Sequence, residues 1–394
     1  MLHFLYMSHI APYPIRGGEK IRASGLIRML SNLGTVDSIV EKEGLSDLPS
    51  TESLPNVRFH PFNFLSEMKP VVRYFFKNHA LVQHIGNILE HHPIDLAVID
   101  YQFYGKYIGF FQAIGIPVIY GTHNAEALLT EQEIRYHSGK KALEKRILSK
   151  IQAHHERLYF PKADAFIVVS RQDEIYYQRW IDPQKIVLIP NFLYPQLYPE
   201  TGRPPPAHNP RKLVMTGNFS VFQNLDGFRW FLQEIWHPFR LFESFELLLV
   251  GRGSEEALEK VCCRRFPPQN IRASGTVDSI LEQIEDAMAS LVPIRYGSGT
   301  RLKVLEAMWQ KIPVISTSLG VEGIEGESNR HFLVADDPKT FAEQLSCLNS
   351  PETRERLVEN ATNLLHQKYT LAANQKRFLE FISARLPACF GREI

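Results

Sequence analysis

Short apolar segments alternate with helical segments along this chain, and this alternation constrains its fold more than any other feature. Leu2–Met7 is apolar and is followed by Glu19–Leu33, in which apolar residues recur at helical spacing. The same alternation continues to the end of the 394 residues. Apolar strands separated by helices are typical of parallel sheets that are covered on both faces. The sequence therefore predicts an α/β fold with two doubly wound, Rossmann-like sheets that face each other across a cleft.

The length of the chain favours two domains, because one hydrophobic core rarely supports 394 residues. Seven prolines lie between Pro190 and Pro210 without periodicity, which is typical of a linker. The last helical segment is long enough to return to the first domain. We therefore predict a first Rossmann-like domain over 1–190, a Pro-rich linker over 191–210, a second Rossmann-like domain over 211–370, and a C-terminal helix over 371–394 that crosses back.

Charge and cysteine content exclude several classes of protein. The chain has 44 Lys and Arg against 43 Asp and Glu, which argues against a dedicated nucleic-acid binder. Its four cysteines show no C-x-x-C spacing, so neither a zinc site nor a disulfide framework is expected. The N-terminus lacks the basic region of a signal peptide, and no apolar run reaches the roughly 20 residues that cross a bilayer. We expect a cytoplasmic protein, with any contact to the inner membrane being peripheral.

Two segments combine basic residues with a helical pattern. Between Met68 and Leu89, basic and aromatic residues are interleaved, and such an edge can lie on an anionic membrane or can pack in the core with a solvated rim. Thr130–Leu158 is predicted to be one long helix, rich in Lys and Arg but diluted by glutamates. Its mixed signs favour a solvated face over a membrane patch.

One strand, glycine loop and helix unit is the strongest candidate for a binding site. The strand Ala289–Ile294 precedes Gly297, Ser298 and Gly299, and a helix is predicted to start near Thr300. The first N–H groups of such a helix are unpaired and lie at the positive end of its dipole. This arrangement suits an anion.

Two cations, Arg301 and Lys303, occupy the first turn of this helix, where acidic residues are ordinarily favoured. Their presence is best explained by a phosphate-bearing ligand that offsets their repulsion. Glu306, one turn further on, can accept hydrogen bonds from ribose hydroxyls. The alternative is an ordinary βαβ unit with a solvated Arg/Lys pair.

Other polar residues follow other predicted strands. Gly17 and Gly18 end the first loop, which lacks G-x-G-x-x-G, so a plain turn and backbone contact to a ligand are both open. His123 follows the strand Ile116–Tyr120, and a lone histidine there is either structural or catalytic. Gly251–Gly253 matches only part of the dinucleotide-binding fingerprint G-x-G-x-x-G. This partial match is the one feature that supports an NAD-dependent dehydrogenase.

Several stretches, taken in order, resemble the retaining glycosyltransferases of family 4, which have the two-domain GT-B architecture. The likeness spans nearly the whole chain. Its stretches are the loop ending in Gly17-Gly18, Thr122–Glu126, Val168–Ser170, Ile189–Asn191, Val214–Asn218, Leu249–Gly251, Ser274–Val277, Gly299–Ala307 and Pro313–Thr317.

The resemblance implies that the second domain holds a nucleotide-diphosphate sugar, with the first domain on the acceptor side. Thr276–Ser279, including Val277 and Asp278, would lie beside the base, and Glu306 would bind the ribose. The loop Gly297–Arg301 with Lys303, and Gly217 and Asn218 after the first strand of this domain, would face the diphosphate. His123 would line the donor sugar. The family needs no metal, and no D-x-D motif is present; no cofactor is expected. The acceptor would be a glycan or a lipid-linked molecule.

Two departures from the family pattern bear on the site. The family pattern has two glutamates separated by seven residues; Glu306 matches the second, and Ser298 stands at the position of the first. The hydroxyls of the donor sugar must therefore be recognised differently. The usual Arg and Lys after the first strand of the second domain are replaced by Asn218–Asn224. We expect Arg301 and Lys303 to take their place. A nucleotide-sugar epimerase of the same fold and a catalytically silent scaffold remain as alternatives; the oligomeric state is not predicted.

Overall fold

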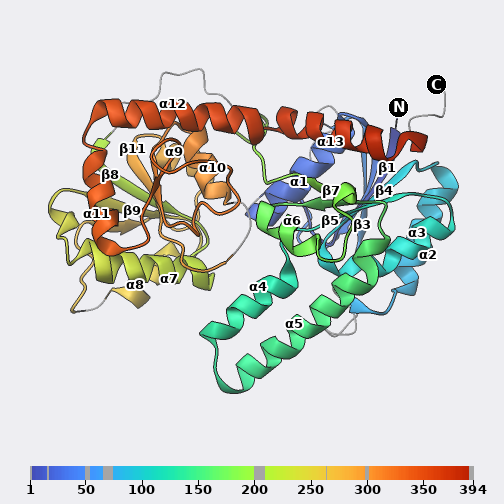
Figure 1. Ribbon diagram of the computed structural model, residues 1–394, viewed down its shortest axis with the longest axis horizontal. Coiled ribbons are helices and arrows are strands. Elements are labelled where there is room, and N and C mark those ends of the chain that lie inside the picture. Colours follow the sequence, from blue (N-terminus) through green and yellow to red (C-terminus); the bar gives the residue numbers. More distant parts are fainter. Residues whose placement is uncertain are drawn as a thin grey trace. The chain divides into compact units, whose positions relative to one another are not determined.

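The computed structural model describes residues 2–15, 17–48, 54–64, 74–198, 209–262, 264–297 and 301–389. The chain divides into two compact units, which are coloured in chain order in Figure 1. Unit 1 comprises Met1–Asn191 and Asn374–Ile394, and unit 2 comprises Phe192–Ala373. Half of the predicted Pro-rich linker (199–208), and part of the segment between Met68 and Leu89, lie outside the described residues.

Unit 1 contains a parallel sheet with the order β3-β2-β1-β4-β5-β6-β7 among its described residues. The order reverses at β1, which pairs with both β2 and β4. Loops that follow β1 and β4 therefore leave the sheet at a topological switch point. The strands are β1 (Leu2–Met7), β2 (Gly34–Glu41), β3 (Val57–Phe62), β4 (Leu96–Asp100), β5 (Val118–Gly121), β6 (Ala165–Val168) and β7 (Ile186–Leu188).

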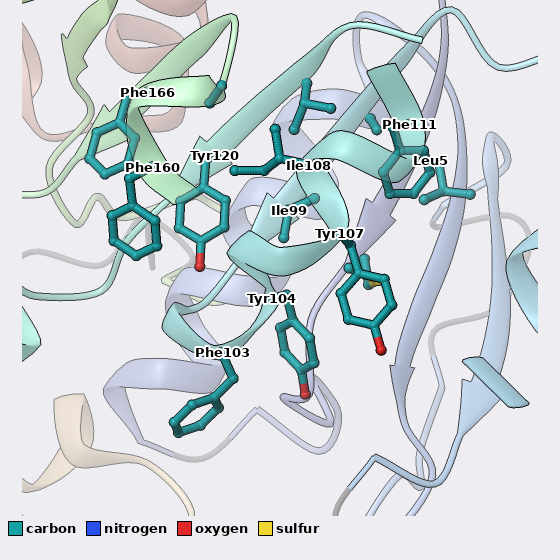
Figure 2. Packing of buried hydrophobic residues seen from close by; sticks show 14 of the residues in the cluster. Leu5, Ile99, Phe103, Tyr104, Tyr107, Ile108, Phe111, Tyr120, Phe160 and Phe166 are labelled. Carbon is teal, nitrogen blue, oxygen red and sulfur yellow. The ribbon is translucent and has the colours of Figure 1, made fainter. Parts of the chain in front are cut away.

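The core of unit 1 is dense in aromatic side chains. Figure 2 shows Tyr120, Phe160 and Phe166 grouped together, and the ring centroids of Tyr120 and Phe160 lie 4.4 Å apart. All three are fully buried, and such ring pairs stabilise a core beyond their apolar area. The helices of this unit are α1 (Gly18–Ser31), α2 (His79–His91), α3 (Ile108–Ala113), α4 (Glu126–Glu133), α5 (Gly139–Tyr159) and α6 (Arg171–Tyr177).

The predicted long helix Thr130–Leu158 is wrong: two helices, α4 and α5, occupy this region. The break falls at Ser138, which is extended, and at Gly139, whose φ of 58° is left-handed. A change of direction becomes possible there, and α4 and α5 pack against each other. In Figure 1 they form a hairpin that projects from the rest of unit 1.

Unit 2 contains a second parallel sheet, with the order β10-β9-β8-β11-β12-β13 among its described residues. Its residues alternate between two apolar clusters: Leu213 and Met215 contribute to one, and Val214 contributes to the other. Both faces of this sheet are therefore covered, as in a doubly wound fold. The strands are β8 (Asn209–Thr216), β9 (Glu246–Val250), β10 (Ile271–Ala273), β11 (Ala287–Val292), β12 (Val314–Ser316) and β13 (Leu333–Val334).

The helices of unit 2 are α7 (Phe222–Trp230), α8 (Ser254–Val261), α9 (Ile280–Ile284), α10 (Leu302–Trp309), α11 (Pro338–Cys347) and α12 (Pro351–Lys368). α9 is short, and Met288, four residues beyond its end, is buried in β11. α13 (Leu371–Arg385) begins in unit 2 and continues in unit 1, where Arg377 donates to the carbonyl oxygen of Leu188 at 3.1 Å.

The prediction of two doubly wound parallel sheets is confirmed by the two strand orders. Within the described ranges, none of the helices combines the length and the apolar character that a bilayer-spanning segment needs.

Candidate functional site

The carboxyl edge of the unit 2 sheet brings most of the predicted binding residues together. β8 pairs with both β9 and β11, so the order of the strands reverses there. Ligands of open α/β sheets bind at this kind of position, beyond the carboxyl ends of the strands. The loop after β8 begins with Gly217 and Asn218, and the loop after β11 leads to Gly297 and α10.

The loop after β8 approaches the start of α10 closely. Asn224 donates to the carbonyl oxygen of Asn218 at 2.7 Å and accepts from Nζ of Lys303 at 2.7 Å. A Cβ atom on Gly217, whose φ is 145°, would lie 2.9 Å from the same Nζ. The ammonium group of Lys303 therefore lies beside the loop in which the family pattern has an Arg and a Lys that this chain lacks.

Lys303 is held in a setting that disfavours its charge. Burial, and after it the positive charge of Arg301, lowers the pKa of Lys303 to about 7. Glu306 opposes this shift only in part. Lys303 thus lies near the midpoint of its titration at neutral pH, and a bound anion would restore its proton.

Arg301 is the N-cap residue of α10 and is 9% exposed. Burial lowers its pKa to about 10, although the charge of Glu322 acts in the other direction. Its Nε and Nη2 atoms are buried and have no hydrogen-bond partner in the described part of the chain. Buried donors without partners are rare, since each carries a desolvation cost. This guanidinium is therefore available to an acceptor that a ligand would supply.

Gly297 lies next to this guanidinium. A Cβ atom on Gly297 would come within 3.1 Å of Nη2 of Arg301 and within 2.2 Å of Oε1 of Gln223, and its φ of 110° suits only glycine. The structure thus brings together Gly217, Asn218, Gly297, Arg301 and Lys303. Ser298, Gly299 and Thr300 lie outside the described residues.

Glu306 is buried on α10, and its Oε1 atom accepts a hydrogen bond from the hydroxyl of Tyr198 at 2.9 Å. Burial raises the pKa of Glu306, while Tyr198 and Lys303 act to lower it. Tyr198 was not identified from the sequence, because nothing in its loop signals that it would reach α10. The hydrogen bond from Tyr198 holds one carboxylate oxygen of Glu306 in place.

Val277 and Asp278 lie between β10 and α9, further along the same edge of the sheet. The loops after β8, β9 and β10 are linked by backbone hydrogen bonds: Phe219 donates to Arg252 at 2.7 Å, and Gly251 donates to Gly275 at 2.9 Å. The predicted base-binding segment is therefore connected to the Lys303 region through two neighbouring loops. Its contact with a base stays a prediction.

In unit 1, His123 follows β5 and donates from Nε2 to Oδ2 of Asp100 at 2.9 Å. The hydroxyl of Tyr6 donates to the same oxygen at 2.7 Å. Burial acts to raise the pKa of Asp100, but the charge and hydrogen bond of His123, with Arg22 and Tyr6, outweigh it and lower this pKa. An ionised carboxylate only accepts, so Nε2 of His123 carries a proton.

Asp100 and Tyr6 were not singled out from the sequence; Tyr6 lies on β1 and Asp100 ends β4, the neighbouring strand at the switch point of this sheet. In the same unit, Gly17 is the N-cap residue of α1, and Gly18 begins this helix. Gly17 has a φ of 91°, and no atom of the described residues lies within 4 Å of the position that its Cβ would take. Backbone contact with a ligand remains a prediction for both glycines.

A metal site was not expected from the sequence. Among the described residues, no group of three or more His, Cys, Asp or Glu side chains is arranged to hold a metal ion. The independence from metals and cofactors stays a prediction.

Comparisons with known proteins identify the class to which this fold and site belong. Over the whole chain, the structure is similar to sucrose-phosphate synthase from Thermosynechococcus elongatus, with a TM-score of 0.72, 17% identity, and coverage of 98% of this chain and 100% of the other. It is also similar to Anabaena Alr3699/HepE, solved in complex with UDP-glucose, with a TM-score of 0.65, 12% identity, and coverage of 98% and 100%. These likenesses define a GT-B fold.

Family models then narrow the class. The model described as Glycosyltransferase Family 4 matches residues 41–197, and the model described as Glycosyl transferases group 1 matches residues 210–350. The chain belongs to these family 4 glycosyltransferases, as the resemblance predicted. Among curated proteins, an uncharacterized 44.6 kDa protein in the cps region of Klebsiella pneumoniae is 29% identical over 140 residues, which cover 34% of this chain and 36% of that protein.

Proposed function

We propose that this protein is a retaining, metal-independent glycosyltransferase that moves a sugar from a nucleotide-diphosphate donor to a glycan or lipid-linked acceptor. The observation that carries the proposal is the buried guanidinium of Arg301, whose Nε and Nη2 atoms lack a partner among the described residues and which lies close to Lys303. Membership in the glycosyltransferase family and the UDP-glucose complex of Alr3699/HepE support a nucleotide sugar as the donor.

The chemistry assigned to the cations is stabilisation of the leaving group. Cleavage of the bond between sugar and phosphate develops negative charge on the diphosphate, and preorganised cations in a dry site favour that charge. Arg301 and Lys303, together with the N-terminus of α10, would provide this stabilisation of the diphosphate. Glu306, held by Tyr198, would accept from the ribose hydroxyls.

For the retaining reaction we propose attack from the leaving-group side, with the departing phosphate oxygen taking the proton of the acceptor. No protein base is then needed. His123, with its ring oriented by Asp100, would bind the donor sugar. Val277 and Asp278 would lie beside the base, with Gly217, Asn218 and the loop Gly297–Thr300 facing the diphosphate.

A panel of nucleotide sugars, each tested with and without oligosaccharide or lipid-linked acceptors, separates the candidate activities. Nucleotide release that depends on an acceptor is the expected result. Release without an acceptor would indicate an epimerase or a hydrolase, and failure to bind any nucleotide sugar would indicate a scaffold. Binding is measured first by thermal shift, because a ligand of the folded state raises the apparent stability.

Replacing Glu306 with alanine is expected to weaken binding of the nucleotide about tenfold, because a carboxyl acceptor for the ribose hydroxyls is lost. Tyr198→Phe removes only the hydroxyl that holds this carboxylate, so a smaller loss of the same kind is expected. Calorimetric titration with the donor measures both. Binding by Glu306→Ala that equals the wild type would remove Glu306 from the nucleotide site.

The low pKa of Lys303 makes donor binding depend on pH. A bound diphosphate raises this pKa from about 7, so protonated Lys303 favours binding below pH 7 and affinity falls above it. The slope is expected to approach about tenfold per pH unit until the bound-state pKa is passed. The diphosphate of a nucleotide sugar keeps its charge in this range, so the slope reports on the protein. Lys303→Met should bind more weakly and lose this slope; an unchanged slope would contradict the assignment.

A further inference from the structure

Helix α5 presents an outward face that carries both large apolar and basic side chains. Leu143, Ile147, Lys150, His154 and Leu158 are all exposed and follow one another at steps of four, three, four and four residues. These steps keep residues on one line along a helix. Leu143, Ile147 and Leu158 are 57%, 51% and 40% exposed, respectively. The apolar residues therefore form a stripe rather than a scattered set.

Cations flank this stripe on the same side of α5. Lys140, Arg146 and Arg157 are exposed, as is Lys150 on the stripe itself. The guanidinium of Arg157 lies over the ring of Trp180, 5.3 Å from its centroid. These residues and the stripe are called the outward face of α5 below.

Both acidic residues of α5, and Glu133 of its partner helix α4, are held away from this face or at its border. Glu133 pairs with Lys145. Glu156 is buried, where it accepts from the backbone of Ala127 at 3.2 Å and from Tyr176 at 2.9 Å. Glu144 lies about 100° around the helix from Leu143, at the border of the face, and its carboxylate is 3.9 Å from Lys140. The acidic and basic residues that are mixed in the sequence of α5 therefore lie largely on different sides of the helix.

The opposite side of α5 is occupied by the body of unit 1. Gln152 and His155 are buried there, and the hydroxyl of Ser149 donates to the carbonyl oxygen of Ala127 at 3.0 Å. The outward face thus belongs to a helix that is already anchored. Figure 1 shows α4 and α5 extending together from the remainder of unit 1. On the outward face itself, the ring centroid of His154 lies 6.0 Å from that of Phe75, while Leu143 and Ile147 are more than half exposed.

We propose that the outward face of α5 docks on a bilayer surface that carries anionic phospholipid headgroups, with Leu143, Ile147 and Leu158 entering the boundary between headgroups and acyl chains. Lysine and arginine side chains around an apolar stripe match an anionic headgroup layer above an apolar interior. Their long stems allow the charged ends to stay at the headgroups while the aliphatic residues go deeper. This inference goes beyond the proposed sugar transfer and does not depend on it.

Co-sedimentation of the full chain with vesicles tests the proposal, and it needs neither donor nor acceptor. Binding is expected to vesicles of mixed phosphatidylglycerol and phosphatidylcholine, and to weaken as salt is added. Little binding is expected to vesicles of phosphatidylcholine alone. Equal binding to both kinds of vesicle, or to neither, would overturn the proposal.

Two double variants separate the charge from the apolar stripe. Arg146→Glu with Lys150→Glu, and Leu143→Ser with Ile147→Ser, are each expected to weaken binding to the anionic vesicles at least tenfold. All four side chains are exposed, so the thermal midpoint should stay close to that of the wild type. Lys260→Glu with Arg264→Glu reverses two exposed cations of unit 2 and gives the same change in net charge; this control should keep its binding.

Binding by the α5 variants that equals that of the control would overturn the assignment of this face. A second copy of the chain is the competing occupant. Analytical ultracentrifugation that showed a wild-type dimer, lost in Leu143→Ser with Ile147→Ser, would also overturn the proposal in favour of self-association.

Discussion

Replacing Arg301 with glutamine is expected to lower kcat with the donor and acceptor about 100-fold. Removing one preorganised donor from a site of developing negative charge commonly has an effect of this size. The loss should appear in kcat more than in KM, because the charge on the diphosphate grows as the bond to the sugar breaks. Steady-state kinetics with the donor that the panel identifies measures both parameters.

Two checks distinguish this result from misfolding. Arg272→Gln removes an exposed arginine of β10 and should leave the kinetics unchanged. The thermal midpoint of Arg301→Gln should equal or exceed that of the wild type, since a buried guanidinium with two unpartnered nitrogens costs stability. A stable Arg301→Gln protein with wild-type turnover would show that this guanidinium has no part in catalysis.

Replacing Gly251 with alanine is expected to lower the free energy of unfolding by about 3 kcal/mol and to abolish measurable nucleotide binding. A Cβ atom there would lie 2.3 Å from the carbonyl oxygen of Gly217, and the φ of 124° is strained for any other residue. The contact is with backbone, so the loop after β8 must move and would carry Gly217 away from Lys303.

Gly86→Ala is the matched control for this substitution. Gly86 lies in α2, and among the described residues no atom beyond its chain neighbours and its own helix backbone is within 4 Å of the position of its Cβ. Alanine there should stabilise the protein by about 0.5–1 kcal/mol without altering nucleotide binding. Thermal unfolding and calorimetric titration of both variants supply the comparison. Wild-type binding by Gly251→Ala would mean that the packing of these two loops is not needed for the site.

The sheets could be predicted from the sequence because apolar strands and helical periodicity are local signals. β1, for example, has the predicted bounds Leu2–Met7. The break between α4 and α5 was missed because helical spacing continues across Ser138 and Gly139, and only the backbone conformation of these residues reveals the turn. A single serine and glycine do not forbid a helix.

The convergence of Gly217, Gly297, Arg301 and Lys303 could be predicted because their strands end at one edge of a parallel sheet. The partners of these residues could not. The hydrogen bonds from Tyr198 to Glu306 and from Lys303 to Asn224 join residues 108 and 79 positions apart, and they depend on side-chain packing that no periodicity encodes. The separation of acidic and basic residues around α5 could not be predicted either. Counting the charged residues of a segment does not show which side of the helix each one occupies.

Calorimetric titration with inorganic pyrophosphate is the most direct test of the claim that Arg301 and Lys303 bind a diphosphate, because this probe requires no knowledge of the base or the sugar. Binding by the wild type, weakened at least tenfold in Arg301→Gln, is the predicted result. Failure of the wild type to bind pyrophosphate or any nucleoside diphosphate, or equal affinity in both proteins, would contradict it.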